Sequence, residues 1–139
     1  MHTEHTSMIF SLLAAAGRIE RRFDRKISMT SGISFTEYRL LKALQTEHDG
    51  IATRVDLANT INLTPSAVTR ALKPLEKIGY INAEKSARDA RQSLASLSSA
   101  ATVVLANSDK LIQDEIALLQ LQPEMHSAVA EFLSSLVWH

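Results

Sequence analysis

The sequence predicts a mainly α-helical fold with one small β hairpin. Apolar residues recur at intervals of three or four along most of the 139 residues, the spacing of amphipathic helices. Only two short segments, 80–84 and 93–97, look like paired strands, and a polar tip separates them. A chain of this length is expected to form one domain with a modest core.

Residues 8–28 are expected to form a long amphipathic helix that ends before Gly32. The cations of its polar side are Arg18, Arg21, Arg22, Arg25 and Lys26. Acidic residues between these cations argue against binding to a membrane surface, so no membrane partner is expected. The first five residues are expected to be disordered. Residues 36–47 form the next predicted helix, with Tyr38 and Leu44 among its apolar positions.

A short strand at 51–53 precedes two predicted helices joined by a tight turn. Thr53 and Asp56 have the spacing of a capping box that opens a helix over residues 54–60, with Val55 and Leu57 facing inward. Two helices with a short turn and a longer second helix form the helix-turn-helix pattern.

The second of these helices lies in the segment 64–80, and we expect the rest of the fold to hold this segment in position. Thr64 can cap it before a proline at the first helical position, and Gly79 can end it. The inward positions are Val68, Leu72, Leu75 and Ile78. Pro74 removes one backbone bond, and we expect a kink there rather than an end and restart, because the apolar face continues beyond it.

The opposite face of this helix carries hydroxyls and long cations, which can meet both phosphates and base edges of DNA. We expect a DNA recognition helix. The predicted contact residues along it are Thr64, Ser66, Ala67, Thr69, Arg70 and Lys73. An ordinary surface helix with a solvated polar side is the alternative, and the preceding helix and turn favour DNA binding over it.

The polar tip between the two strands, residues 85–92, contains Arg88, Asp89 and Arg91. A hairpin in this position is the wing of a winged helix-turn-helix, and its arginines can enter a minor groove. Asp89 would hold a neighbouring arginine in position. A solvated hairpin without a partner is the alternative.

The terminal helices carry more apolar surface than a small winged domain can cover. Ser98 is a suitable N-cap for a helix that runs to about residue 120, and Pro123 begins a last helix. We therefore expect a homodimer built from dimerisation helices at residues 8–30 and 98–139, flanking a DNA-binding lobe at residues 34–97, within one domain over 1–139. A monomer in which one helix folds back over the core is the alternative.

The amino-acid composition and the distribution of charge exclude several classes of function. The chain has no cysteine and a net charge of zero, but residues 64–91 carry six cations against three anions, and residues 92–139 one cation against five anions. A cationic middle and an acidic end fit a protein whose middle alone touches phosphate. No cofactor, no metal and no enzyme activity are expected, since neither ligand spacing nor a catalytic motif is present. Without a signal peptide or spanning segment, we expect a cytoplasmic protein.

Several strings resemble the MarR family of winged helix-turn-helix regulators. The resemblance covers nearly the whole chain and lies in three strings, Ser34-Phe35-Thr36-Glu37-Tyr38-Arg39, Ser66-Ala67-Val68-Thr69-Arg70 and Asp89-Ala90-Arg91 with Leu97-Ser98 after it. In the third string Ala90 stands where the family usually has an arginine, and Pro74 is uncommon in its recognition helix.

The resemblance implies a homodimeric repressor that binds a pseudo-palindromic operator and is released by a small aromatic or acidic ligand. By position, the recognition helix would meet the major groove and Arg91 the minor groove. The ligand site of the family lies between the dimer helices and the DNA-binding lobe, where Arg18, Arg22 and Tyr38 would suit a carboxylate. Solvated arginines are the alternative there. A winged-helix dimer that binds proteins and no operator is the competing function.

Overall fold

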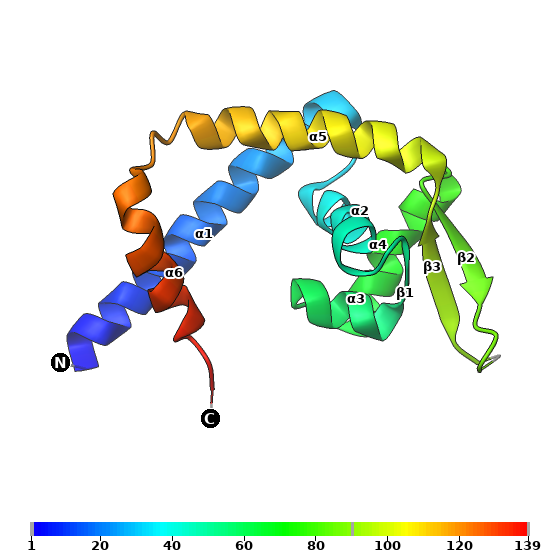
Figure 1. Ribbon diagram of the computed structural model, residues 1–139, viewed down its shortest axis with the longest axis horizontal. Helices are drawn as coiled ribbons and strands as arrows, with labels where there is room; N and C mark the ends of the chain where they lie inside the picture. Colours follow the sequence, from blue (N-terminus) through cyan, green and yellow to red (C-terminus); the bar gives the residue numbers. More distant parts are fainter. Residues whose placement is uncertain (1, 90, 139) are drawn as a thin grey trace.

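The computed structural model describes residues 2–89 and 91–138 and confirms a mainly helical fold with a small antiparallel wing (Figure 1). The elements are α1 (His2–Ser31), α2 (Phe35–Glu47), β1 (Ile51–Thr53), α3 (Arg54–Ile61), α4 (Pro65–Lys77), β2 (Ile81–Lys85), β3 (Ser93–Leu97), α5 (Ser99–Ala117), the 3-10 turn η1 (Pro123–Met125) and α6 (His126–Ser134). In Figure 1, α5 runs along the top from the wing at one end to α1 and α6 at the other. The helix-turn-helix lies below α5, next to the wing.

Helix α1 is longer than the sequence predicts at both ends. The expected disordered start is wrong from His2 onward, because the polar first turns lack an apolar signal but also lack a proline or glycine that would stop a helix. The helix ends at Gly32, whose φ of 73° and N–H bond to the Ser28 carbonyl (3.2 Å) turn the chain.

Helix α2 begins at a reciprocal cap. The Ser34 Oγ accepts from the Glu37 N–H (3.0 Å), and the Glu37 carboxylate accepts from the Ser34 N–H (2.7 Å). Leu40, Leu41 and Leu44 are fully buried, so α2 forms the centre of the core beneath α5.

The helix-turn-helix is built from α3, a left-handed residue at Asn62 and α4. Thr53 caps α3 by accepting from the Asp56 N–H (3.1 Å), while Leu57 is fully buried, as predicted. Val55 was expected to face inward, and this is wrong, since 56% of it is exposed. It lies two positions before Leu57, so the short helix turns it to the opposite side.

Helix α4 continues through Pro74 without ending, and the restart alternative is wrong. Thr64 caps it by accepting from the Ala67 N–H (3.1 Å), and Val68, Leu72 and Leu75 are fully buried. Ile78 does not continue the buried face, because the helix ends before it and 55% of Ile78 is exposed. Gly79, at φ 87°, then leads the chain into the wing.

The wing is part of a three-stranded antiparallel sheet in the order β1-β3-β2. The predicted edge strand β1 pairs with β3 through Ala52 and Ala95, and β2 pairs with the other edge of β3. Because β1 comes directly before α3, this pairing fixes strand β3 of the wing to the helix-turn-helix.

Helix α5 packs the buried Ala101, Val104 and Leu105 against the lobe. Its N-cap position is Ser98, as predicted, but the Ser98 hydroxyl donates to the Gly79 carbonyl (2.6 Å) instead of capping the helix. The helix ends at Ala117, short of the predicted end near residue 120, and Leu118 and Leu119 beyond it are exposed within this single chain.

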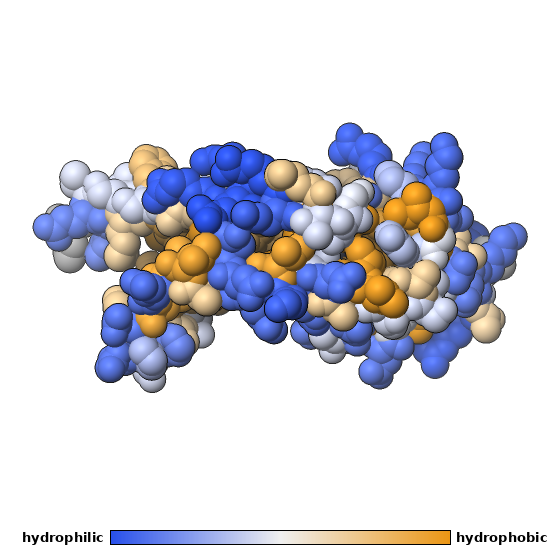
Figure 2. All heavy atoms as spheres, turned by 90° about the horizontal axis from the view of Figure 1, so that it is seen from above, coloured by the Kyte–Doolittle hydropathy of each residue, from blue (hydrophilic) through white to orange (hydrophobic). Residues whose placement is uncertain are grey.

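The end of the chain that holds α6 leaves many large apolar side chains exposed. In Figure 2, which looks down on the molecule from above, hydrophobic patches break the hydrophilic surface at this end. Exposed apolar residues there are Phe10, Leu13, Leu121, Met125, Val129, Leu133 and Trp138. Across the described residues, no helix combines the length and apolar character required to cross a bilayer.

Candidate DNA-binding surface

The polar face of α4 points away from the core. Thr64, Ser66, Arg70 and Lys73 are exposed, and Ala67 and Thr69 are half-buried. This exposure follows from the helical period, since the buried Val68, Leu72 and Leu75 occupy the opposite side. All six predicted contact residues of α4 therefore lie on its accessible side or at its accessible N-terminal end.

The cations of α4 are free to meet a partner. Within residues 2–89 and 91–138, neither Arg70 nor Lys73 forms an ion pair with a carboxylate. Other cations of the chain are bound by its own acids, among them Arg22, Lys26 and Lys42. Arg70 and Lys73 thus keep their charges exposed on the second helix of the helix-turn-helix, with no acidic partner among the described residues.

The tip of the wing holds two exposed arginines, Arg88 and Arg91. Asp89 accepts the Arg91 backbone N–H (3.0 Å) and lies 3.5 Å from the Arg91 Nε, while 94% of the Arg91 side chain remains exposed. Such a contact orients the arginine without removing it from solvent. Ala90, between these residues, lies outside the described part of the chain.

A shallow hollow beside α4 is lined in part by Arg54, a cation that the sequence pattern does not single out. Its lining consists of Arg54, Pro65, Ser66, Thr69 and Arg70. Arg54 is the first residue of α3, and its Nη1 donates to the Ser93 carbonyl at the start of β3 (3.3 Å). Residues 54 and 70 are far apart in sequence, and only the helix-turn-helix packing reveals that they share a surface.

The structure does not bring the three predicted ligand-binding residues into one cluster. Arg18 is exposed on α1, one helical turn before Arg22. The Arg22 Nε donates to Glu115 of α5, whose other oxygen lies 3.4 Å from the Lys26 Nζ. The hydrogen bond from Arg22 lowers the pKa of the Glu115 carboxyl, against the opposing effect of burial.

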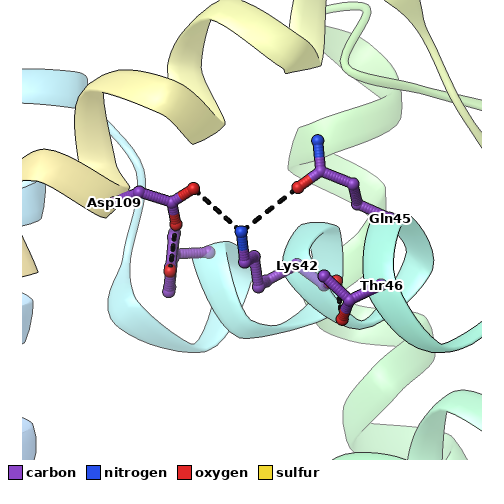
Figure 3. Close-up of polar contacts among 5 residues, drawn as sticks. Lys42, Gln45, Thr46 and Asp109 are labelled. Carbon is purple, nitrogen blue, oxygen red and sulfur yellow. Dashed lines mark hydrogen bonds and ion pairs between the residues drawn. The ribbon is translucent and has the colours of Figure 1, made fainter.

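A second polar cluster between α2 and α5 joins Lys42, Gln45 and Asp109 (Figure 3), and it also includes Tyr38 of α2. The Tyr38 hydroxyl donates to one oxygen of Asp109 (2.5 Å), and the Lys42 Nζ donates to the other (2.8 Å) and to Gln45 (3.3 Å). Burial of the ring, followed by the bond to Asp109, raises the pKa of the Tyr38 hydroxyl. Asp109 and Glu115 are thus the partners that sequence reasoning did not find.

A cavity of about 620 Å³ lies between α1, α2 and the turn before α4. Its polar lining includes Glu20, Arg21, Asp24 and Arg39, and it contains none of the three predicted ligand residues. No group of three potential metal ligands occurs among residues 2–89 and 91–138.

Comparisons with known proteins agree with this geometry. The model of the MarR family matches residues 33–93, which span the helix-turn-helix and the hairpin up to the start of β3. No curated protein sequence matches the chain.

Solved structures share the fold over nearly the whole chain. A MarR family regulator, Sco3205 from Streptomyces coelicolor in complex with DNA, is 25% identical, with 94% of this chain and 84% of that chain covered and a TM-score of 0.84. A mutant of MarR from E. coli complexed with operator DNA is 15% identical, with 99% of both chains covered and a TM-score of 0.84. The organohalide-sensing regulator RdhR-CbdbA1625, bound to 2,4-dichlorophenol, is 20% identical, with 98% and 80% covered and a TM-score of 0.78.

Proposed function

We propose that the chain, a member of the MarR family of DNA-binding, winged helix-turn-helix transcriptional regulators, is a homodimeric repressor of a pseudo-palindromic operator. The family consists of transcription regulators and not of enzymes. The observation that carries the proposal is the unpaired cationic face of α4, exposed beside a basic wing. As a regulator that must reach DNA, the protein would act in the cytoplasm.

In this proposal α4 enters the major groove of each operator half. Arg70 is the candidate for reading a base, because an arginine can donate two hydrogen bonds to guanine. Ser66, Thr69 and Lys73 lie on the same face and can hold phosphates or base edges. Arg91, oriented by Asp89, would reach the flanking minor groove.

The proposed dimer rests on the apolar surface of the terminal helices. Phe10 and Leu13 of α1 are 66% and 62% exposed, and Leu121 after α5 is 61% exposed. Exposing an apolar surface of this size to water is unfavourable. This supports a homodimer in which a second copy of the chain buries it. A two-fold dimer would also present two copies of α4 to the two halves of a pseudo-palindrome.

Release by a small aromatic or acidic ligand completes the proposal. RdhR-CbdbA1625 binds a chlorinated phenol, which supports a ligand of similar chemistry here. A ligand carboxylate could take the place of Glu115 at Arg22, with Arg18 one turn away on the same helix. Exchange of that partner would loosen the contact between α1 and α5, and α5 leads directly from the wing.

Selection from a random pool of DNA duplexes tests the proposal. We expect enrichment of a pseudo-palindrome whose binding weakens steeply with salt. Arg70→Ala should cost about 1–3 kcal/mol on the selected duplex and relax the preference at one position of each half-site. Arg25→Ala, which removes an exposed arginine of α1, is the matched control and should bind as the wild type does.

The alternative is a winged-helix dimer that binds other proteins and no operator. It predicts that no duplex is enriched and that Arg70→Ala and Arg25→Ala behave alike. That outcome would replace the operator-binding proposal.

A further inference from the structure

We infer that Arg54 of α3, together with the hydroxyls of Ser66 and Thr69, holds one phosphate of the DNA backbone beside the base-reading Arg70 of α4. The inference rests on the proposed function and adds a residue to its binding surface. It assigns Arg54, the first residue of the helix-turn-helix, to the DNA contact.

Two helices contribute to the phosphate site. The shallow hollow has arginines from both helices in its lining, together with the hydroxyl residues Ser66 and Thr69 of α4. All four side chains can donate hydrogen bonds, and none of them is acidic. A group that offers only acceptors and carries negative charge, as a phosphate does, matches such a lining.

Arg54 is held in place before any ligand arrives. It is half-buried, and its Nη1 donates to the Ser93 carbonyl at the start of β3, next to the tip of the wing (3.3 Å). A guanidinium has five N–H donors in a planar fork, so this bond leaves most of them for a ligand. The anchored side chain loses less conformational freedom on binding than a fully exposed arginine would.

The charge of the hollow is not neutralised by the chain. Over the residues that the structure describes, neither Arg54 nor Arg70 forms an ion pair. The acid nearest to Arg54 in sequence, Asp56, is exposed in the first turn of α3 and does not line the hollow. Two unpaired guanidiniums on one surface repel each other, and a phosphate bound at Arg54 relieves this repulsion.

A contact of this kind predicts a salt effect that is independent of sequence. Each phosphate contact contributes about 0.9 to the slope of log affinity against log salt, so a dimer that loses Arg54 in both chains should show a slope shallower by about 1.8. Affinity should fall by the same factor for the selected duplex and for a scrambled one, because phosphates carry no sequence information.

The experiment measures dissociation constants of the full chain between 50 and 200 mM salt on both duplexes. Arg54→Gln removes the charge but keeps an amide that can donate to Ser93, and it should show the shallower slope. Arg54→Lys keeps the charge and should keep the slope, which also tests the site if the glutamine variant does not fold. Arg25→Ala, on α1, controls for the loss of an arginine elsewhere.

An unchanged slope in Arg54→Gln, or an effect confined to the selected duplex, would overturn the inference. Failure of the wild type to bind any duplex would instead refute the proposed function. A second measurement asks whether the natural occupant of the hollow is DNA or a free anion. It follows the thermal unfolding temperature while inorganic phosphate is added at constant ionic strength. The hollow would be assigned to a free anion if phosphate stabilises the wild type more than Arg54→Gln while the salt slope on DNA is the same in both proteins.

Discussion

The hydrogen bond between Tyr38 and Asp109 should contribute measurably to the attachment of α5 to α2. Tyr38→Phe removes only the hydroxyl and keeps the ring packed in the core, where 8% of Tyr38 is exposed. A hydrogen bond to a charged group contributes about 1.5–3 kcal/mol. Asp109 keeps its pair with Lys42, and its side chain is 27% exposed, so we expect a loss of about 1–2 kcal/mol, near the lower end of that range.

Urea unfolding at pH 7 measures this loss as a lower midpoint with an unchanged slope. Tyr80→Phe is the matched control, since Tyr80 is half-buried and its hydroxyl makes no hydrogen bond to another of the described residues. We expect Tyr80→Phe to keep the wild-type midpoint more closely than Tyr38→Phe does.

The pH dependence gives a second test of the same bond. The pKa of Tyr38 is raised in the folded chain, so the stability from its protonated hydroxyl is fully present below the ordinary tyrosine pKa of about 10. It is lost as pH rises above that value. The deficit of Tyr38→Phe should therefore be constant near neutrality and shrink above about pH 10. Equal midpoints for the two tyrosine variants, or a deficit that grows in alkali, would refute the reasoning.

Three further predictions concern α5, the core and the wing. The lowered pKa of Glu115 implies stability that is present above the ordinary glutamate pKa and lost as pH falls through the lowered one, so the deficit of Glu115→Gln should vanish in acid. Thermal unfolding against pH measures this. Leu72→Ala, at a fully buried site, should cost about 2–5 kcal/mol in urea unfolding. Arg91→Ala should weaken binding more on operators with A·T-rich flanks than on those with G·C-rich flanks, by titration of both duplexes.

The helix boundaries that the sequence predicts well are those with a local cause. Thr64 and Gly79 act through their own backbone neighbours, and the structure places Thr64 at the N-cap of α4 and Gly79 just beyond its C-cap. Ser98 has the predicted position, but its hydroxyl bonds to Gly79, a partner 19 residues away. Local spacing finds the cap, whereas the choice of hydrogen-bond partner depends on the folded chain.

Periodicity predicts the buried face of a helix only as far as the helix continues. Ile78 fits the apolar spacing of α4 but lies beyond the last helical residue, and it is exposed. Val55 was expected to be buried in a helix of only eight residues, where two turns give too weak a period to assign each position.

Contacts between distant segments account for what sequence reasoning missed in the candidate sites. Tyr38 and Asp109 are 71 residues apart, and Arg22 and Glu115 are 93 apart. No spacing rule connects such pairs. The sequence pattern therefore points to Arg22 and Tyr38 without their acidic partners, and it does not point to Arg54.

Footprinting with hydroxyl radicals on the selected duplex tests the central claim most directly. The account predicts two protected patches on one face of the duplex, about one helical turn or 10 bp apart, with weaker protection of the flanking minor grooves by the wings. It also predicts that Arg70→Ala removes both central patches together. A single patch, or protection that survives unchanged in Arg70→Ala, would contradict the account.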